Sequence, residues 1–110
     1  ISGNRVEGSD YAGGGGLLAT DSAVLTNVTI TQNAIQADPT VFADGGGVRI
    51  ILGGLDMTNS IIAGNTSTSE SPDCSGTIVS SGYNLIGNNA DCNYTAGTGD
   101  IVGDVNGGPC

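Results

Sequence analysis

The sequence predicts an all-β protein: a single-stranded parallel β-helix (β-solenoid) of about three to four coils, spanning residues 1–110 as one domain, with its loops on one side. Three observations predict it, namely a repeated motif, alternation of apolar residues with period two, and a scarcity of bulky side chains. The 110 residues include 20 Gly but only one Phe, one Met and no Trp. Aliphatic side chains of this kind suit narrow stacked layers better than one compact core.

The repeated motif keeps its register along the chain. Thr26-Asn27 recurs as Thr58-Asn59, 32 residues later, and ITQN (30–33) recurs as IAGN (62–65) at the same offset. ISGN (1–4) and LIGN (85–88) add two outer copies. The aliphatic column is Ile1, Ile30, Ile62 and Leu85, and the asparagine column is Asn4, Asn33, Asn65 and Asn88. Periods of 20 to 50 residues are typical of arrays whose units bury their apolar faces against one another.

The unit is extended rather than helical. The stretch VLTNVTI (24–30) alternates two faces, and VRII (48–51) and LDMTNSII (55–62) are short and bounded by Gly or Asn. Segments of variable length follow the asparagine column at 5–12, 34–44, 66–75 and 89–96, which predicts loops there. Gly permits close backbone approach and positive φ at each bend, and stacked Asn amides hydrogen-bond from coil to coil.

The motifs GGG…LTNVTITQN, GGGV…MTNSIIAGN and DCSGTIVSSGYNLIGNNADC (73–92) resemble the parallel β-helix repeats of secreted and surface-anchored bacterial proteins, including choice-of-anchor and polymorphic-outer-membrane-type repeat proteins. The resemblance covers nearly all of the chain. It implies a right-handed helix, an extracellular or cell-surface location and a non-catalytic role. It supplies no active site.

The three cysteines fit an oxidising compartment. Cys74 and Cys92 follow the Asn column in successive coils, which predicts a disulfide between them worth roughly 3 kcal/mol, with pairings to Cys110 left open. Cys110 is an odd cysteine that serves as a free thiol, bonds to another chain, or marks a shortened one. The chain has no His, and its thiols lack metal-ligand spacing, so neither a zinc site nor another metal or cofactor is expected.

The charge excludes some classes of partner. Eleven acidic residues face only Arg5 and Arg49, giving a net charge of -9. Nucleic-acid binding is therefore not expected, and no apolar run is long enough for direct membrane insertion. Candidate acids for polysaccharide cleavage include Asp21, Asp44, Asp56, Asp100 and Asp104. The chain offers only Arg5 and Arg49 as the cations that a lyase-type site needs, so such a site is not expected. Calcium binding at Asp100 and Asp104 lacks the repeated calcium motif, and the Thr-x-Thr array of an ice-binding face does not continue beyond Thr29 and Thr31.

Neither end of the sequence has a capping segment, which predicts unprotected sheet edges. Two interpretations follow: the chain is a piece of a longer β-helix, or its copies stack end to end. We expect the second, an extracellular structural protein that forms a filament, with Cys110 placed to lock a junction. The alternative is an adhesion module of a larger surface protein, in which Tyr11, Phe42 and Tyr94 contact a protein or a glycan. A polysaccharide-active enzyme ranks third.

Overall fold

The computed structural model describes residues 1–8, 11–38, 42–68 and 71–103, and these residues contain strands and no helix. Every strand pair among them is parallel. The predicted all-β class is therefore confirmed. Cys110 and Asp104 lie outside the described residues.

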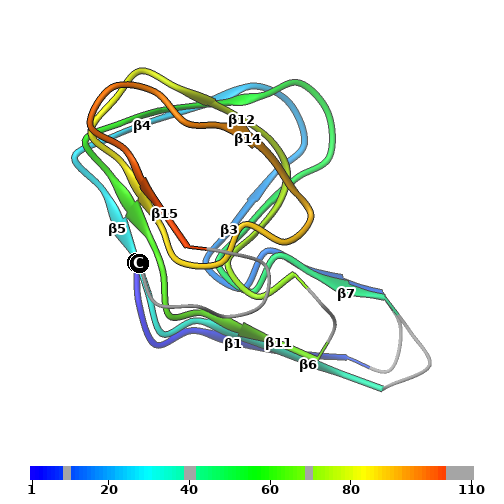
Figure 1. Ribbon diagram of the computed structural model, residues 1–110. Helices are drawn as coiled ribbons and strands as arrows, with labels where there is room; N and C mark the ends of the chain where they lie inside the picture. Colours follow the sequence, from blue (N-terminus) through cyan, green and yellow to red (C-terminus); the bar gives the residue numbers. More distant parts are fainter. Residues whose placement is uncertain (9–10, 39–41, 69–70, 104–110) are drawn as a thin grey trace.

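The strands fall into four sheets that the chain visits repeatedly (Figure 1). The first sheet contains β1 (Arg5–Gly8), β6 (Ala34–Ala37) and β11 (Thr66–Ser67), and the second contains β2 (Ala12–Gly13) and β7 (Ala43–Asp44). The third contains β3 (Leu17–Ala19), β8 (Val48–Ile50), β12 (Cys74–Ser80), β9 (Leu55–Thr58), β4 (Ala23–Thr26) and β14 (Cys92–Thr95). The fourth contains β5 (Thr29–Ile30), β10 (Ile61–Ile62), β13 (Leu85–Ile86) and β15 (Ile101–Val102).

Each circuit of the chain through these sheets is called a pass. Strands β1 to β5 form the first pass, β6 to β10 the second, β11 to β13 the third, and β14 and β15 the fourth. Each strand of the second pass pairs with its counterpart in the first, as Leu55 of β9 does with Ala23 of β4 and Ile62 of β10 with Ile30 of β5. The alternating apolar pattern favours this arrangement because it gives every strand one inward face.

The passes enclose two separate cores. In Figure 1 the strands β3, β4, β5, β12, β14 and β15 surround a triangular part, and β1, β6, β11 and β7 run through a flatter part below it. The triangular part is filled by ten buried residues that include Leu55, Met57, Ile62 and Ile86. The flat part holds a thinner core of Ala12, Ile35, Ala37 and Ala43. The small side chains explain why two sheets can pack so closely there.

The glycine runs lie where the two parts meet. A Cβ on Gly16 would lie 2.8 Å from Nδ2 of Asn33, and a Cβ on Gly47 would lie 2.6 Å from Nδ2 of Asn65. Real Cβ atoms do not approach polar atoms this closely, so only glycine fits beside the asparagine side chains. The repeated glycine and asparagine are thus two halves of one contact.

The last pass is shorter than the others. After Gly87 the chain goes on to β14 in the triangular part, and β14 pairs with β12. The described residues of this pass contain no strand of the flat part. The first two passes therefore have both parts, whereas the last has only the triangular one.

The loop prediction is wrong in part for all four segments. Residues 5–8 and 34–37 directly follow the asparagine column, yet they form β1 and β6, which pair with each other in parallel. Thr66–Ser67 and Cys92–Thr95 also form strands, β11 and β14. Val6 and Ile35 point inward, whereas the polar residues beside them, Arg5, Glu7 and Gln36, are exposed. This alternation over four residues is enough to make a strand when a second sheet covers its inner face.

Candidate functional site

A ladder of side-chain amides crosses the passes where the two parts of the molecule meet. Oδ1 of Asn33 accepts hydrogen bonds from the backbone N–H of Asn4 (3.1 Å) and from its Nδ2 (2.9 Å). Oδ1 of Asn65 accepts the same two bonds from Asn33, at 3.0 and 3.1 Å. Each asparagine thus donates twice to the next pass, and Asn33 and Asn65 are buried.

The next acceptor in this ladder is Asp73, which sequence analysis missed. Its Oδ1 accepts the backbone N–H and Nδ2–H of Asn65, each at 2.9 Å, and its Oδ2 accepts the backbone N–H of Asn88 at 2.8 Å. The side chain of Asn88 instead accepts the N–H of Ala90 in a local turn. A carboxylate can only accept hydrogen bonds, so Asp73 closes the ladder at this end.

The aliphatic column needs one correction. Ile62 pairs with Ile30 on one side, but on the other side its partner is Ile86, because Leu85 pairs with Ile61. Ile30, Ile62 and Ile86 are fully buried, Leu85 is only partly buried, and Ile1 at the edge is 50% exposed. The predicted Leu85 was wrong by one residue, and a slip of one residue in a strand exchanges its two faces.

A second polar ladder lies at another corner of the triangular part. The backbone N–H of Val28 donates to Oγ of Ser60, that of Ser60 donates to Oδ1 of Asn84, and that of Asn84 donates to Oδ1 of Asp100. The backbone N–H of Asp100 donates to the carbonyl of Gly97. At the other end, the side chain of Val28 has no acceptor that could continue the ladder. The second ladder is therefore closed at both ends.

Asp100 has a strongly lowered pKa. Partial burial raises its pKa, but hydrogen bonds from Ser80, Tyr94 and the backbone N–H groups of Asn84 and Gly97 outweigh that effect and hold the pKa at about 2. Burial, and then the hydrogen bond to Asp100, raise the pKa of the Tyr94 hydroxyl. At neutral pH Asp100 is therefore ionised, whereas Tyr94 keeps its proton.

Tyr94 is therefore not the loop contact that the sequence predicts. It belongs to β14, packs against the core of the triangular part and donates its hydroxyl proton to Asp100. Its neighbour Cys92 forms the predicted disulfide with Cys74, with the two Cα atoms 5.5 Å apart. That prediction is confirmed, although both cysteines begin strands and do not lie in loops.

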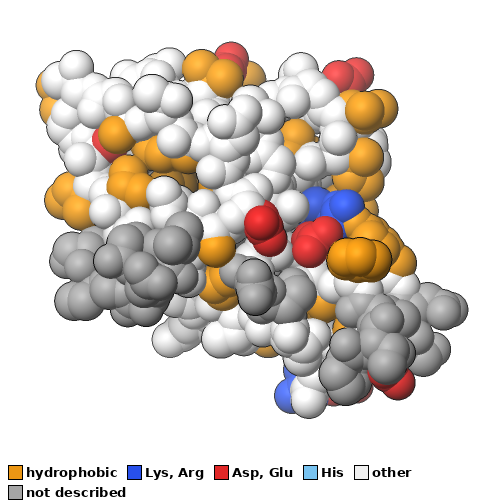
Figure 2. All heavy atoms as spheres, turned by 45° about the vertical axis from the view of Figure 1, so that its right-hand side comes forward, with side chains coloured by type: hydrophobic (Ala, Val, Ile, Leu, Met, Phe, Trp, Pro, Cys, Tyr) orange, Lys and Arg blue, Asp and Glu red, His pale blue; other side chains and the backbone are white. Residues whose placement is uncertain are grey.

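Tyr11 and Phe42 do come together. Ala12 pairs with Ala43 in neighbouring passes, which places the two aromatic residues before them side by side, 54% and 74% exposed. The guanidinium carbon of Arg49 lies 4.4 Å from the centre of the Tyr11 ring. Figure 2 shows basic, acidic and hydrophobic side chains next to one another on this face of the molecule.

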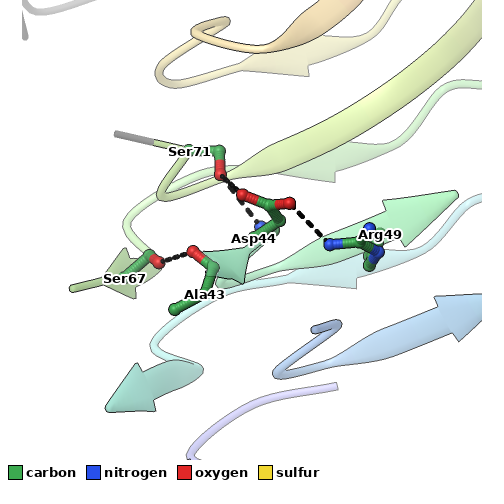
Figure 3. A network of polar contacts seen from close by, with 6 residues as sticks. Ala43, Asp44, Arg49, Ser67 and Ser71 are labelled. Carbon is green, nitrogen blue, oxygen red and sulfur yellow. Dashed lines mark hydrogen bonds and ion pairs between the residues drawn. The ribbon is translucent and has the colours of Figure 1, made fainter. Parts of the chain in front are cut away.

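A polar network holds Arg49 in place (Figure 3). Its Nη1 donates to Oδ2 of Asp44 at 2.6 Å, and the hydroxyl of Ser71 donates to Oδ1 of the same carboxylate. The Nε of Arg49 is buried and makes no hydrogen bond within the described chain. Burial lowers the pKa of Arg49 from its usual value. The arginine is thus fixed under an exposed aromatic pair.

The first pass forms an open edge. Among the residues that the structure describes, each of β1 to β5 has a strand partner on one side only, and this partner always belongs to the second pass. The asparagine ladder is open at the same edge, because Oδ1 of Asn4 accepts no hydrogen bond from the residues that the structure describes. This edge, comprising β1 to β5 and Asn4, is called the first-pass edge below.

The described residues contain no cluster of side chains suited to a metal ion. They also contain no helix long and apolar enough to cross a bilayer. Comparison of the chain with family models, curated proteins and solved structures finds no match. The functional argument therefore rests on the geometry of this chain alone.

Proposed function

We propose that this chain is a non-catalytic structural module of an extracellular right-handed parallel β-helix, and that its first-pass edge accepts a further coil of the same kind. Each pass is then one coil of the helix. The observation that carries this proposal concerns residues 1–8, 11–38, 42–68 and 71–103: within them, all five strands of the first pass lack an outer partner, and the side-chain ladder ends there in an unused acceptor.

The alternation of backbone groups shows what the edge offers. The N–H of Ala23 in β4 donates to the carbonyl of Gly54 in the second pass, so the N–H of the following residue, Val24, points to the outer side. Unpaired strand edges bind added strands through main-chain hydrogen bonds. The edge is thus a template for a parallel strand at each of its five segments.

The acidic groups support a structural role. Asp73 is occupied by donors from Asn65 and Asn88, Asp100 by four donors, and Asp44 by Arg49 and Ser71. A carboxylate that acts as a general acid or base must exchange its proton near the working pH. The disulfide supports the extracellular location, since such bonds persist in oxidising compartments.

An extended chain tests the proposal. Ser2 bridges to Thr31, so Ile1 occupies in the first pass the place of Ile30 in the second. A copy of residues 1–29 joined directly before Ile1 therefore adds one coil in register. We expect the N–H of Val24 to exchange with solvent at least about 100-fold more slowly in the extended chain than in the original. Equal exchange rates in the two chains would refute the edge as a docking surface.

A second candidate function is recognition of a saccharide by Tyr11 and Phe42. Two exposed aromatic rings on adjacent passes, with Arg49 and Asp44 beside them, offer a stacking surface flanked by charged hydrogen-bonding groups. Aromatic residues of this kind dominate recognition sites.

Calorimetric titration with neutral and acidic oligosaccharides tests this candidate. We expect Tyr11→Ala and Phe42→Ala each to weaken binding about tenfold or more, with Val24→Ala as the control because Val24 is 71% exposed on another sheet. Equal affinity of all three variants would remove the candidate.

A further inference from the structure

The first-pass edge sets chemical conditions on the coil that it accepts. In the described ladder, each acceptor oxygen receives two protons from one asparagine of the preceding pass, one from its backbone and one from its Nδ2. Oδ1 of Asn4 stands in the same position as Oδ1 of Asn33 and Asn65, but no donor reaches it within the described chain. A coil that completes the ladder must place an asparagine there.

The length of the incoming coil is restricted as well. The edge includes β1 and β2 of the flat part together with β3, β4 and β5 of the triangular part. A coil that leaves out the flat part would cover the last three strands and leave the outer groups of β1 and β2 unpaired. A full-length coil has the extent of the first pass, in which Asn4 and its ladder partner Asn33 are 29 residues apart.

The described part of the last pass, residues 87–103, meets neither condition. It has no strand in the flat part, and the ladder beside it ends in Asp73, which has no proton to donate from its carboxylate. Asn88, which follows in the last pass, already uses its backbone N–H on Asp73. Residues 87–103 of one copy, placed on the first-pass edge of another, would therefore leave β1 and the ladder acceptor incompletely paired.

We infer that the first-pass edge binds a full-length β-coil bearing asparagine at the ladder position, and does not bind the short pass that residues 87–103 form in a second copy. This inference rests on the proposed function and names the partner of the same edge. Recognition comes from the paired donors of one asparagine and from five parallel strand contacts. The asparagine fixes the register, since a slip by one residue would move its side chain to the other face.

Variants of the extended chain test the asparagine. In the added copy of residues 1–29, Asn4→Ala removes the Nδ2 donor and keeps the backbone N–H. We expect the backbone amides of the native Arg5 to Gly8 to exchange about tenfold faster in this variant than in the unsubstituted extended chain. Glu7→Ala in the added copy, at a position whose side chain is 63% exposed in the original chain, is the matched control and should retain full protection. Equal protection with both substitutions would overturn the role of asparagine.

A shortened copy tests the length. An added coil that joins residue 4 directly to residue 13 mimics the short last pass, and we expect it to protect β3 to β5 while leaving β1 unprotected. Protection of β1 by this shortened coil would overturn the length condition. If no added coil, full-length or short, slows exchange at the edge, the proposed function itself fails, which is a different result.

Sedimentation of the original chain tests whether a second copy of the chain can supply the coil that binds the first-pass edge. We expect the chain to remain monomeric across the accessible concentration range, because the pass formed by residues 87–103 does not fit the edge. Self-association that also protects the N–H of Val24 would show that a second copy binds there. That result would overturn this inference and leave the proposed docking edge intact.

Discussion

Removal of the Asp73 carboxylate should damage the protein more than any other change to a single acidic residue in the described chain. Its oxygens accept three hydrogen bonds, two from Asn65 and one from the backbone of Asn88, and the residue is 3% exposed. Asp73→Ala leaves these three donors without acceptors. An unsatisfied buried donor costs about 1–3 kcal/mol, so the expected loss is about 3–5 kcal/mol after allowance for relaxation.

Asp73→Asn provides a milder comparison. The oxygen of the new amide can still accept both protons of Asn65. Its NH2 group, however, takes the place of the oxygen that accepts the N–H of Asn88, and it lies close to Gly87, where space is short. We expect this variant to lose about 1–2 kcal/mol. Asp56→Ala is the matched control, because Asp56 is exposed on β9 and its loss should cost less than about 0.5 kcal/mol.

Urea unfolding with the disulfide intact measures these differences. For a domain of this size the slope is about 1–1.5 kcal/mol per M, so Asp73→Ala should lower the midpoint by about 2–4 M and Asp73→Asn by about 1 M. If Asp73→Ala and Asp56→Ala unfold at the same midpoint, the ladder does not stabilise the fold. Should Asp73→Ala fail to fold, the smaller loss for Asp73→Asn still decides the question.

Three further predictions concern the contacts beside this ladder. Gly47→Ala should cost at least about 2 kcal/mol by urea unfolding, since its Cβ would meet an asparagine amide, whereas Gly54→Ala, with no atom closer than 3.8 Å, should cost little; equal losses would contradict the steric argument. The folded-state pKa of Asp100 is about 2, below its usual 3.8, so its contribution to the free energy of unfolding is complete above pH 4 and disappears as the pH falls through about 2. The expected loss, allowing for solvent screening, is on the order of 1 kcal/mol, and Asp100→Asn should abolish this pH-dependent loss in acid titrations of stability. Reduction of the bridge between Cys74 and Cys92 should cost roughly 3 kcal/mol in unfolding experiments, and a loss below about 1 kcal/mol would contradict the loop-entropy estimate.

The parts of this structure that repeat in the sequence are the parts that sequence reasoning reaches. Alternation around Val24 to Ile30 predicts strands, and the strands β4 and β5 occupy most of that stretch. The cysteine positions predict a bridge that the structure contains. Both inferences depend on local patterns, which a parallel stack repeats from pass to pass.

The remaining features depend on how long each pass is. LIGN (85–88) resembles the earlier copies, but the third and fourth passes are shorter, so Ile86 takes the inward place expected for Leu85. The same shortening brings Asp73 to the ladder in place of another asparagine. A sequence motif cannot show this, because the position of Asp73 is set by the path of the whole third pass.

The account depends most on the first pass being an open edge. Val24 in β4 and Asp56 in β9 are register partners, and the N–H of each points toward the side of the preceding pass. Asp56 finds β4 there, whereas Val24 finds no strand within the described chain. The most direct measurement is hydrogen exchange of these two amides by NMR in dilute solution. The account predicts that Asp56 is protected at least about 1,000-fold while Val24 exchanges at nearly the unprotected rate. Equal protection of both amides would contradict it, because the edge would then be covered already.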